Sequence, residues 1–550
     1  MNPSSKKFLL LLSLCLVGPP MLVAQELPDK ATCEFYERYS DWPEDLKING
    51  SLLVSDSIEG FNRYIASSDY TRKNIKQWVV VGSIDSTKSL LLANESYQAI
   101  SLLSKMTWTQ QIPPVESLDA DTLLVVCDDR PFHEIPKERF ESVGQTIEQH
   151  LSKGAMACFV GPACVASGKL AIDIPGSREL AEGLGLIPDA LVCFNENGQC
   201  EPSVCEVLKA DHRCVLLTIA KGNSWVLQGR KGMLYGPGTA STWVGSGEDS
   251  QSSSSSIQAR SQSNRNAPES YLLDWTQWRR LAIERTLERF PPEQRQTPRV
   301  PHGSLVIVGG GGMPPGLMQK FVQLAGGADA RIVYVPCAEE DDMTSDTRLL
   351  EVWKQMGAKS ALLLHTKDRR IADQDPKFLE PLQDATGIWF GGGRQWNLAD
   401  SYYGTQAHRL MKQVLDRGGV IGGSSAGASI QGSYLARATP IENFRIMAPG
   451  YERGGLGFIS GVAIDQHFTQ RRRQKDLISL VDTYPQMLGI GIDESTAILV
   501  QESQAQVIGP GKVTFNWKDG DQTQIQEFIG NQGDCFDLAG RCQIKRGSVD

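Results

Sequence analysis

The stretch Gly418–Ile430 constrains the fold most strongly, because it has the sequence GGVIGGSSAGASI and contains the pattern G-x-S-x-G around Ser425. An apolar pair precedes the pattern and small residues that can open a helix follow it. This is the layout of a nucleophile elbow, a sharp strand-to-helix turn that exposes a serine above a sheet. Glycines two positions either side of the serine let such a turn close without a side-chain clash. Glycine and serine are common, so the pattern alone also fits an ordinary Gly-rich turn, and its context has to decide.

The residues before the elbow predict alternating strands and helices. Gly387–Phe390 is a short apolar run that ends in Gly391–Gly393, and Thr405–Leu415 has apolar residues at helical spacing behind a threonine cap. Strand, Gly-rich loop, helix, strand and elbow therefore follow one another. This order is typical of an α/β fold with a doubly wound, mostly parallel sheet flanked by helices and with its site at the strand ends.

A catalytic serine needs a base and an orienting acid. His467 is the only histidine after the elbow, and the next apolar strand, Leu488–Ile492, runs straight into Asp493 and Glu494. The implied order along the chain is serine, histidine, acid. An α/β-hydrolase has the order serine, acid, histidine, so the order argues against that fold.

Six short motifs surround these residues: VIVGGGGMP (306–314), RIVYVP (331–336), GGGRQ (391–395), GGSSAGA (422–428), DQHF (465–468) and GIGIDESTA (489–497). In this set, residues 301–515 resemble the cyanophycinase-like branch of peptidase family S51, serine peptidases with a class I glutamine-amidotransferase-like fold. The resemblance implies that Ser425 is the nucleophile, His467 the base and Glu494 the acid.

Further residues are candidates for binding the substrate. The resemblance implies this role for Gln395 and Gln466. Arg471 and Arg473 follow the predicted base closely, and guanidinium groups bind carboxylates through two parallel hydrogen bonds, which suits an aspartyl substrate. A solvated helix start explains these two arginines equally well. Cyanophycinases resemble one another in having a further arginine where this chain has Asp476, so the chain departs from their pattern at that position.

Backbone groups complete the predicted site. Acyl transfer needs N–H donors that face the developing oxyanion, and those of Ala426 and of Gly392 or Gly393 are the expected donors. Gly309–Gly312 follow the apolar run Val306–Val308. They lack the P-loop pattern and the context of a dinucleotide-binding motif, so we expect a close turn beside the active site rather than a phosphate cradle. The sequence predicts neither a cofactor nor a metal.

The first residues predict export. Lys6 and Lys7 precede the apolar run Phe8–Val17, and a small residue follows near position 24, as in a secretory signal over residues 1–24. The run is shorter than the ~20 apolar residues that a membrane-spanning helix needs. We therefore expect a secreted or periplasmic protein that is not attached to a membrane once the signal is removed.

Composition bears on the class of partner. A net charge of −9 disfavours nucleic acid, because there is no basic stripe to offset the phosphates. Twelve cysteines suit an exported protein, and Cys535 and Cys542 are close enough in sequence to staple a C-terminal hairpin. The spacings of a second cluster do not match a zinc site, so disulfides or free thiols are favoured for Cys193, Cys200, Cys205 and Cys214.

Two segments of the chain recur later in it. Gly183–Asn195 lies without gaps over Gly455–His467, and Ala220–Gly238 lies over Asp493–Gly511, at offsets that differ by one residue. We infer an internal duplication, whereas two α/β domains with independently similar strands are the alternative.

The first copy lacks the predicted catalytic side chains. Asn195 takes the place of the histidine and Lys221 the place of the acid, and Gly154–Cys164 has no G-x-S-x-G. Asparagine has no usable base, and lysine would repel the imidazolium that the acid should stabilise. We expect the first copy to be degenerate and to serve as a packing partner for the second, with a binding module for a polymeric substrate as the alternative.

The predicted organisation has four parts. A Ser-rich stretch with few apolar residues predicts a flexible linker over Gly245–Pro268, and Glu269–Phe290 has the spacing of a helix whose tryptophans pack against neighbours. The parts are a signal peptide at 1–24, a degenerate S51-like α/β domain at 25–245, the linker and helix at 246–300, and a catalytic cyanophycinase-like domain at 301–550.

The function that follows is that of a secreted serine peptidase of cyanophycinase type. It would hydrolyse β-aspartyl-arginine isopeptide bonds or related aspartyl peptides through an acyl-enzyme, with a peptide or an aspartyl-arginine polymer as substrate. An S51-like exopeptidase or dipeptidase for Asp-X or isoaspartyl peptides is a second hypothesis, and a non-catalytic surface binding protein is a third. A homodimer is expected, or a pseudo-dimer made by the two copies within one chain.

Overall fold

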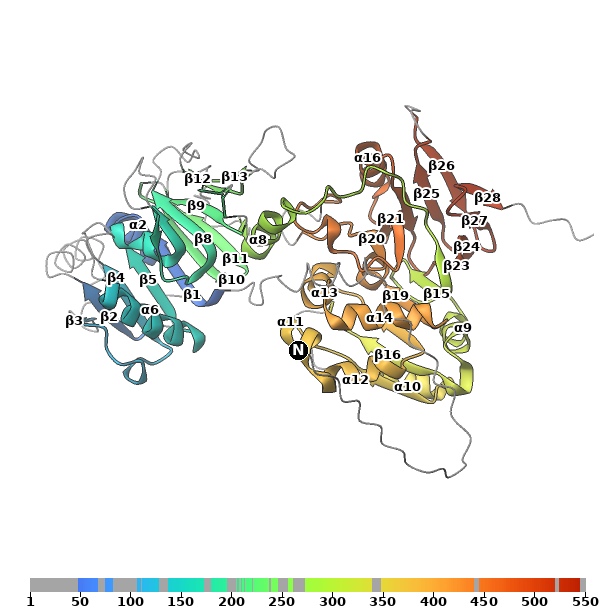
Figure 1. The fold of residues 1–550 in the computed structure, drawn as a ribbon, viewed down its shortest axis with the longest axis horizontal. Coiled ribbons are helices and arrows are strands. Elements are labelled where there is room, and N and C mark those ends of the chain that lie inside the picture. The colour runs from blue at the N-terminus through green and yellow to red at the C-terminus, as the bar shows by residue number, and fades with distance from the viewer. Residues whose placement is uncertain are drawn as a thin grey trace, which may run out of the picture.

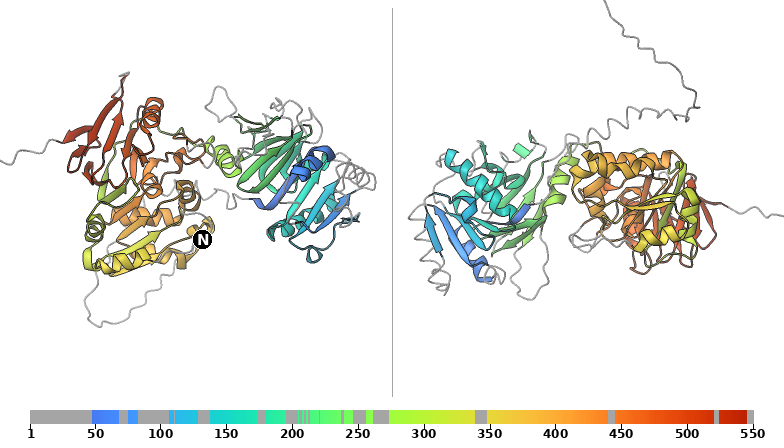
Figure 2. Two further views of the ribbon diagram at one scale, coloured as in Figure 1. Left: turned by 180° about the vertical axis from the view of Figure 1, so that it is seen from behind. Right: turned by 90° about the horizontal axis from the view of Figure 1, so that it is seen from below.

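The computed structural model describes residues 48–544 with internal gaps at 68–74, 83–105, 110, 128–136, 173–179, 195–203, 205–206, 209, 212, 220, 237–238, 246–255, 261–272, 339–347, 440–444 and 520–523. The predicted signal at 1–24 and Asn195 lie outside the described residues. The chain forms two α/β halves, residues 48–274 and 300–544, with helix α8 between them (Figures 1 and 2). None of the helices in the described part is long and apolar enough to cross a membrane.

The first half contains two sheets. The larger has the order β14-β11-β10-β1-β5-β4-β2-β3, and the smaller has the order β13-β12-β9-β8-β6-β7. The strands are β1 (Ile48–Ser55), β2 (Gln77–Gly82), β3 (Met106–Thr109), β4 (Thr122–Cys127), β5 (Met156–Val160), β6 (Gly168–Ile172), β7 (Ala181–Glu182), β8 (Ile187–Phe194), β9 (Val215–Ile219), β10 (Ser224–Gly229), β11 (Lys231–Tyr235), β12 (Thr239–Trp243), β13 (Ser256–Arg260) and β14 (Leu273–Asp274).

The second half also contains two sheets. The larger has the order β17-β16-β18-β19-β15-β23-β24-β27-β28, and the smaller has the order β20-β21-β22-β25-β26. The strands are β15 (Val300–Val308), β16 (Arg331–Val335), β17 (Ser360–Leu363), β18 (Gly387–Phe390), β19 (Val420–Ser424), β20 (Gly432–Tyr434), β21 (Ile459–Gln466), β22 (Leu488–Ile492), β23 (Ala497–Glu502), β24 (Gln504–Ile508), β25 (Val513–Trp517), β26 (Gln526–Gly530), β27 (Cys535–Asp537) and β28 (Cys542–Ile544).

Helices cover the sheets, and their amphipathic spacing explains where they form. Thr405 caps α14 by accepting a hydrogen bond from the His408 N–H, as the sequence predicts. The α-helices are α2 (Ile58–Ser67), α6 (Lys137–Ser152), α8 (Trp275–Glu284), α9 (Leu317–Leu324), α10 (Arg348–Gln355), α11 (Arg369–Gln374), α12 (Pro376–Asp384), α13 (Gln395–Tyr402), α14 (Gln406–Asp416), α15 (Ala426–Ser429) and α16 (Gln474–Thr483). The 3-10 turns are η1 (Val115–Ser117), η3 (Pro162–Ser167), η4 (Gly327–Asp329) and η5 (Glu452–Gly454).

The two halves have the same strand order. Strands β3-β2-β4-β5-β1-β10-β11 of the first half correspond in order and direction to β17-β16-β18-β19-β15-β23-β24 of the second. In the smaller sheets, β6-β8-β9-β12-β13 correspond to β20-β21-β22-β25-β26. The strand registers give the same pairs of positions as the sequence offsets, because Phe194 pairs with Ile219 and Gln466 pairs with Ile492.

The sheets are less parallel than the sequence pattern predicts. In the nine-stranded sheet, β17, β16, β18, β19 and β15 run parallel, whereas β23, β24, β27 and β28 pair antiparallel. Only Ser503 separates β23 from β24, which is too short for the crossover that a parallel pair requires. Each half is therefore a mixed α/β unit with two sheets, rather than one mostly parallel, doubly wound sheet.

The predicted linker and helix also differ in detail. β13 lies in the Ser-rich stretch and pairs with β12, and β14 pairs with β11, so both belong to sheets of the first half. The helix begins at Trp275 rather than near Glu269, because Asp274 caps it by accepting from the Gln277 N–H. Trp275 and Trp278 are buried in the core of the first half, which confirms their predicted packing role.

The predicted C-terminal hairpin forms, but without a disulfide. β27 pairs with β28 in a register that places Cys535 opposite Ile544 and Cys542 opposite Asp537. The two cysteines are therefore not opposite one another, and neither is in a disulfide. Cysteines 200 and 205 of the second predicted cluster lie outside the described residues.

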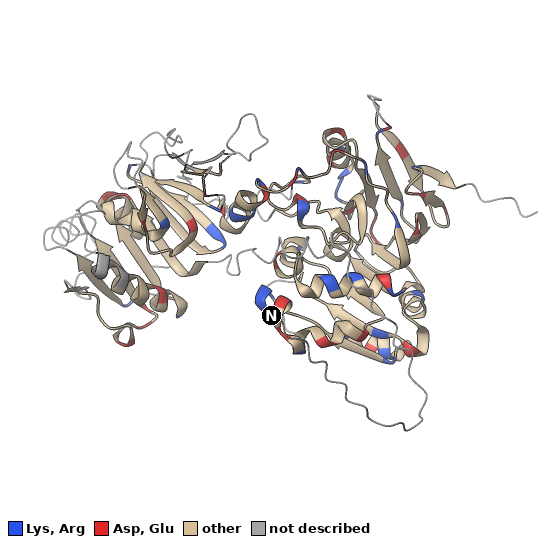
Figure 3. Cartoon of the chain, in the orientation of Figure 1, with Lys and Arg blue, Asp and Glu red and all other residues tan. Residues whose placement is uncertain are grey.

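Charged side chains are distributed over both halves. Figure 3 shows basic and acidic positions interspersed along the helices and loops, while the sheet strands carry few of either.

At the junction, Arg230 of the first half donates to Asp400 of α13 at 2.8 Å and to Asp274 at 2.6 Å. Arg280 of α8 pairs with the same Asp400 at 3.2 Å and stacks over the Tyr451 ring at 4.7 Å. This network joins the first half to the helix that begins with Gln395.

Candidate active site

Ser425 occupies a sharp turn between β19 and α15. Its φ and ψ of 57° and −112° lie where residues other than glycine are rarely found. The sheet stabilises this strained conformation, because the Ser425 N–H donates to the Val308 carbonyl of β15 at 3.0 Å. Gly423 and Gly427 have no room for a side chain, since an added Cβ would lie 2.2 Å from the Gly427 carbonyl oxygen and 2.3 Å from the Phe390 carbonyl oxygen, respectively. The turn has the geometry predicted for an elbow.

His467 reaches Ser425 from the end of β21. Its Nε2 lies 2.9 Å from the Ser425 Oγ, and its N–H donates to the Gly309 carbonyl at 2.8 Å. The side chain is buried, and burial lowers the pKa of the imidazole, while the hydrogen bond to Glu494 acts in the opposite direction. Burial therefore favours the neutral ring, whose Nε2 can accept a proton.

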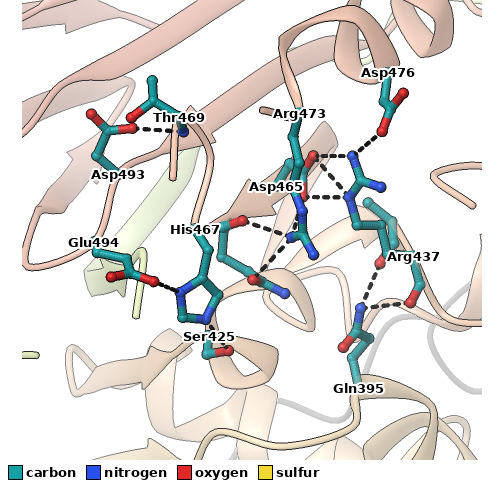
Figure 4. A network of polar contacts seen from close by, with 12 residues as sticks. Gln395, Ser425, Arg437, Asp465, His467, Thr469, Arg473, Asp476, Asp493 and Glu494 are labelled. Atoms are coloured by element: carbon teal, nitrogen blue, oxygen red, sulfur yellow. Dashed lines mark hydrogen bonds and ion pairs between the residues drawn. The ribbon is translucent and has the colours of Figure 1, made fainter. Parts of the chain in front are cut away.

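Glu494 accepts the other hydrogen bond of the imidazole. Its Oε1 lies 2.6 Å from the His467 Nδ1, so serine, histidine and glutamate form one chain of polar contacts (Figure 4). The neighbouring Asp493 has a different role, because its carboxylate accepts from the N–H groups of Thr469 and Lys512 at 3.0 Å each. Asp493 therefore connects two loops through hydrogen bonds, whereas Glu494 orients the imidazole of His467.

The four glycines after β15 lie against the histidine and the glutamate. A Cβ on Gly310 would lie 2.4 Å from His467 Cε1, and one on Gly311 would lie 2.6 Å from the Glu494 carboxyl carbon. Both glycines have positive φ, of 95° and 68°. The Gly310 carbonyl accepts from the Ser495 N–H at 2.8 Å. The loop is therefore a close turn over the histidine–glutamate pair, as the sequence predicts.

Two of the predicted oxyanion donors, Ala426 and Gly392, lie next to the serine. Ala426 is the first residue of α15, so its N–H has no carbonyl partner within the helix. Gly392 approaches from the loop after β18, and a Cβ on it would lie 3.6 Å from the Ser425 Cβ. Gly393 follows with a φ of 129°. Two backbone segments therefore converge on Ser425, as a site for a developing oxyanion requires.

The two predicted substrate-binding glutamines are both buried near the serine. Gln395 begins α13, and its Nε2 donates to the carbonyls of Ala436 and Arg437 at 3.0 and 2.7 Å. Gln466 directly precedes His467, and its Oε1 accepts from Arg473 Nη1 at 3.1 Å.

The two predicted arginines differ in environment. Arg471 is exposed, and its charge contributes to lowering the pKa of His467. Arg473 is buried, and its Nη1 also donates to Asp465 at 3.0 Å and to the Gln466 carbonyl at 2.7 Å. A solvated helix start therefore describes Arg471 but not Arg473.

Sequence reasoning missed Arg437. This buried arginine makes three hydrogen bonds to Asp465, between 2.9 and 3.0 Å, and donates to Asp476 at 2.7 Å (Figure 4). Asp465 belongs to a motif of the chain, but no motif or spacing marks Arg437, which follows β20 by three residues. Only its contacts place it in the site. In the described part of the chain, no three His, Cys, Asp or Glu side chains are grouped as a metal site would need.

The first half has different residues at the positions that correspond to the site. Ser55 pairs with Val160 as Val308 pairs with Ser424, so Gly161 corresponds to Ser425. The same register logic places Lys221 at the position of the glutamate, since Ser224 corresponds to Ala497. The first half therefore has the turn without the serine.

Comparison with known proteins defines the family. The model of peptidase family S51 matches residues 305–508. The cyanophycinase of Geminocystis herdmanii is 34% identical over 201 residues, which are 36% of this chain and 74% of that protein. The cyanophycinase of Trichormus variabilis is 30% identical over 235 residues, which are 40% of this chain and 76% of that protein. A crystal structure of a peptidase from an acI-B1 Actinobacterium is 26% identical, with a TM-score of 0.33, and the match covers 43% of this chain and 97% of that one.

The α/β fold and the matched residues define a hydrolase of the peptidase class. The chain belongs to peptidase family S51. The match lies in the second half, which also holds the linked serine, histidine and glutamate.

Proposed function

We propose that the second half is a serine peptidase that cleaves amide bonds at aspartyl residues, within a polymer of aspartate and arginine or in shorter aspartyl peptides. The observation that carries the proposal is the unbroken chain from Ser425 Oγ through His467 to Glu494, with contacts of 2.9 and 2.6 Å. The similarity to cyanophycinases supports the substrate class.

The mechanism follows from where charge develops. His467 Nε2 takes the proton of Ser425 as the Oγ attacks the substrate carbonyl, and Glu494 stabilises the imidazolium and fixes its tautomer. The tetrahedral oxyanion would face the N–H of Ala426 and that of Gly392 or Gly393, where each donor is typically worth about 2.7–4 kcal/mol. His467 then gives its proton to the leaving amine, and water hydrolyses the acyl-enzyme.

We also propose that the two halves arose by internal duplication and that the first is non-catalytic. The common strand order and the agreement between register and sequence offset support duplication. Gly161 and Lys221, where the second half has its serine and its glutamate, support loss of catalysis. The contacts of Arg230 with Asp400 and Tyr451 support a packing role for the first half, which could stand in for the partner of a homodimer. The N-terminal sequence supports export.

The test is release of β-aspartyl-arginine dipeptides from cyanophycin, measured for the protein and for its Ser425→Ala variant. We expect release by the unaltered protein and none by the variant. If nothing is released but a fluorophosphonate still labels Ser425, the peptidase stands and the polymer is discarded in favour of shorter aspartyl peptides. If neither occurs, the chain does not act as a serine peptidase.

A further inference from the structure

The acid of the candidate site has a different main-chain anchor from the nucleophile and the base. Ser425 and His467 donate their N–H groups to two successive carbonyls at the end of β15 and just after it, at 3.0 and 2.8 Å. The Glu494 N–H instead donates to a side chain, the amide of Gln470, whose Oε1 lies 3.1 Å away. A side chain therefore anchors the main chain of the acid, whereas main-chain carbonyls anchor the other two residues.

Gln470 belongs to the loop that carries the base. The His467 carbonyl accepts from the Arg471 N–H at 3.0 Å, and the Phe468 carbonyl accepts from the Arg473 N–H at 3.0 Å. These two hydrogen bonds close the loop on itself directly after the histidine. The main chain at Gln470 therefore has a fixed place relative to the imidazole.

The loop of the base and the loop of the acid hold one another in both directions. The Thr469 N–H donates to Asp493 Oδ1 at 3.0 Å (Figure 4), while the Glu494 N–H donates to Gln470 Oε1. Each loop thus offers one side-chain oxygen to a main-chain N–H of the other. Because only the oxygen of a carboxamide can accept from an N–H, this contact also fixes which way the Gln470 amide points.

The position of Glu494 makes such an anchor necessary. Its side chain is 37% exposed, against 10% for the side chain of His467, so water competes for the carboxylate. The next residue, Ser495, has a φ of 54°, which is uncommon for a residue other than glycine. The Ser495 N–H donates to the Gly310 carbonyl at 2.8 Å. The main chain of the acid is therefore held on one side by the four-glycine turn and on the other by Gln470.

We infer that Gln470 is a positioning residue, whose amide oxygen holds the main chain of Glu494 and so keeps the carboxylate on His467 Nδ1. The inference rests on the proposed function and deepens it, because it adds to the serine, histidine and glutamate a side chain that sets their geometry. The hydrogen bond from Glu494 to Gln470 is open to solvent. Water can replace it, so its loss should leave the fold in place.

The charged groups that face the imidazole supply a readout for this contact. Burial lowers the pKa of His467, the hydrogen bond from Glu494 raises it, and the charges of Arg471 and Arg473 lower it. A carboxylate that leaves the ring therefore lowers the pKa of His467 further. If Gln470 holds Glu494 in place, a change at Gln470 should be visible in the titration of the histidine.

The experiment follows the His467 imidazole directly, so that it does not depend on turnover. The full chain is isotope-labelled at histidine Cε1, and the His467 signal, identified by its loss in His467→Gln, is titrated by NMR. Gln470→Met keeps the length of the side chain and removes the acceptor. We expect a lower His467 pKa in this variant, and a kcat for an aspartyl peptide that falls by about 3- to 10-fold at unchanged KM, because one main-chain hydrogen bond is lost.

Two further variants separate positioning from a structural role. Gln470→Glu keeps an acceptor for the Glu494 N–H and adds a negative charge near the ring, so the pKa of His467 should rise and kcat should stay within about threefold. Gln474→Met is the matched control, because Gln474 is the exposed first residue of α16, four residues further along. It should change neither the His467 pKa nor kcat. Thermal unfolding of each variant checks that the fold is kept.

The outcomes distinguish this inference from the proposed function. An unchanged His467 pKa in Gln470→Met overturns the inference, and so does a pKa that moves in the same direction in Gln470→Met and Gln470→Glu. A lower melting temperature with an unchanged pKa would assign Gln470 a structural role only, which also overturns it. If the pKa moves as expected but the unaltered protein hydrolyses no aspartyl peptide, the hold of Gln470 on Glu494 stands and the peptidase is removed.

Discussion

The two halves make the same turn at corresponding positions, but only one of them has the serine. Ser425 has a φ of 57° and donates its N–H to Val308, while Gly161 has a φ of 80° and donates to Ser55 at 3.1 Å. Glycine adopts this conformation freely, whereas serine is strained in it. The comparison shows that the same strand frame forms this turn with either residue, so the hydroxyl group is what distinguishes the second half.

The loops beside the turn also differ between the two halves, in the acceptor of one backbone hydrogen bond. In the second half, Ser495 donates its N–H to the backbone carbonyl of Gly310. In the first half, Gly222 corresponds to Ser495, and it donates to the side-chain carboxylate of Asp56 at 2.8 Å instead. Burial raises the pKa of Asp56. In the first half an acidic side chain therefore accepts the N–H that in the second half goes to the backbone of the four-glycine turn.

The largest expected effect comes from giving the second half the residue of the first. Ser425→Gly should lower kcat by about 10⁴- to 10⁶-fold, because it removes the nucleophile. Its melting temperature should not fall, because glycine relieves the strain of the turn. Steady-state hydrolysis of an aspartyl peptide and a thermal melt check this. Ser424→Ala, one residue away, should remain active, and Gly161→Ser should add no second active site. Residual activity near that of the unaltered protein would refute Ser425 as nucleophile.

The second exchange concerns the acid. Glu494→Lys copies Lys221 of the first half and should lower kcat by about 10³- to 10⁴-fold, since a cation beside the ring opposes the imidazolium that forms. Labelling of Ser425 by a fluorophosphonate should slow in parallel. A loss confined to KM would show that Glu494 acts on the substrate rather than on His467.

The pH profile tests the same contact with a smaller perturbation. Neutral His467 is the active base, so kcat/KM should rise with pH through the imidazole pKa, which burial holds below its usual value of 6.5. The Glu494 hydrogen bond raises that pKa. Glu494→Gln should therefore shift the acid limb of kcat/KM to lower pH while lowering its plateau. An acid limb that moves to higher pH would contradict the assigned contact.

The sequence predicts much of the local structure of the second half, and the serine, histidine and glutamate that it pairs lie in contact. β18 has the predicted bounds, Thr405 caps α14 as expected, and the two glycines that mark the elbow in the sequence have no room for a Cβ. These features are local, so a short window contains the cause. The antiparallel strands after Glu494 and the contacts of Arg437 depend on pairing between distant segments, and no short window contains that information.

A substitution in the four-glycine turn, Gly309–Gly312 of the second half, should have a smaller effect on kcat. Gly310→Ala should lower kcat by about 100-fold, because the added Cβ displaces the imidazole that it would touch. Gly316→Ala is the matched control, since Gly316 also has a positive φ, 76°, with nothing within 4 Å of an added Cβ. Both variants add backbone strain of about 1–2 kcal/mol. Similar kcat losses in the two variants would show that strain, and not displacement of His467, is the cause.

The smallest expected effect on activity tests whether the halves are coupled. Arg230→Ala removes a half-buried cation from Asp274 and from Asp400, and the nearly fully buried Asp274 is left without that partner. We expect destabilisation of about 3 kcal/mol, measured by denaturant unfolding, with kcat changed by no more than about twofold, because Asp400 keeps its pair with Arg280 and α13 stays in place. Since α13 begins with Gln395, any movement of the helix should appear as a higher KM before it appears in kcat. A large loss of kcat with normal stability would mean that the first half helps to organise the catalytic serine. Its role would then go beyond packing.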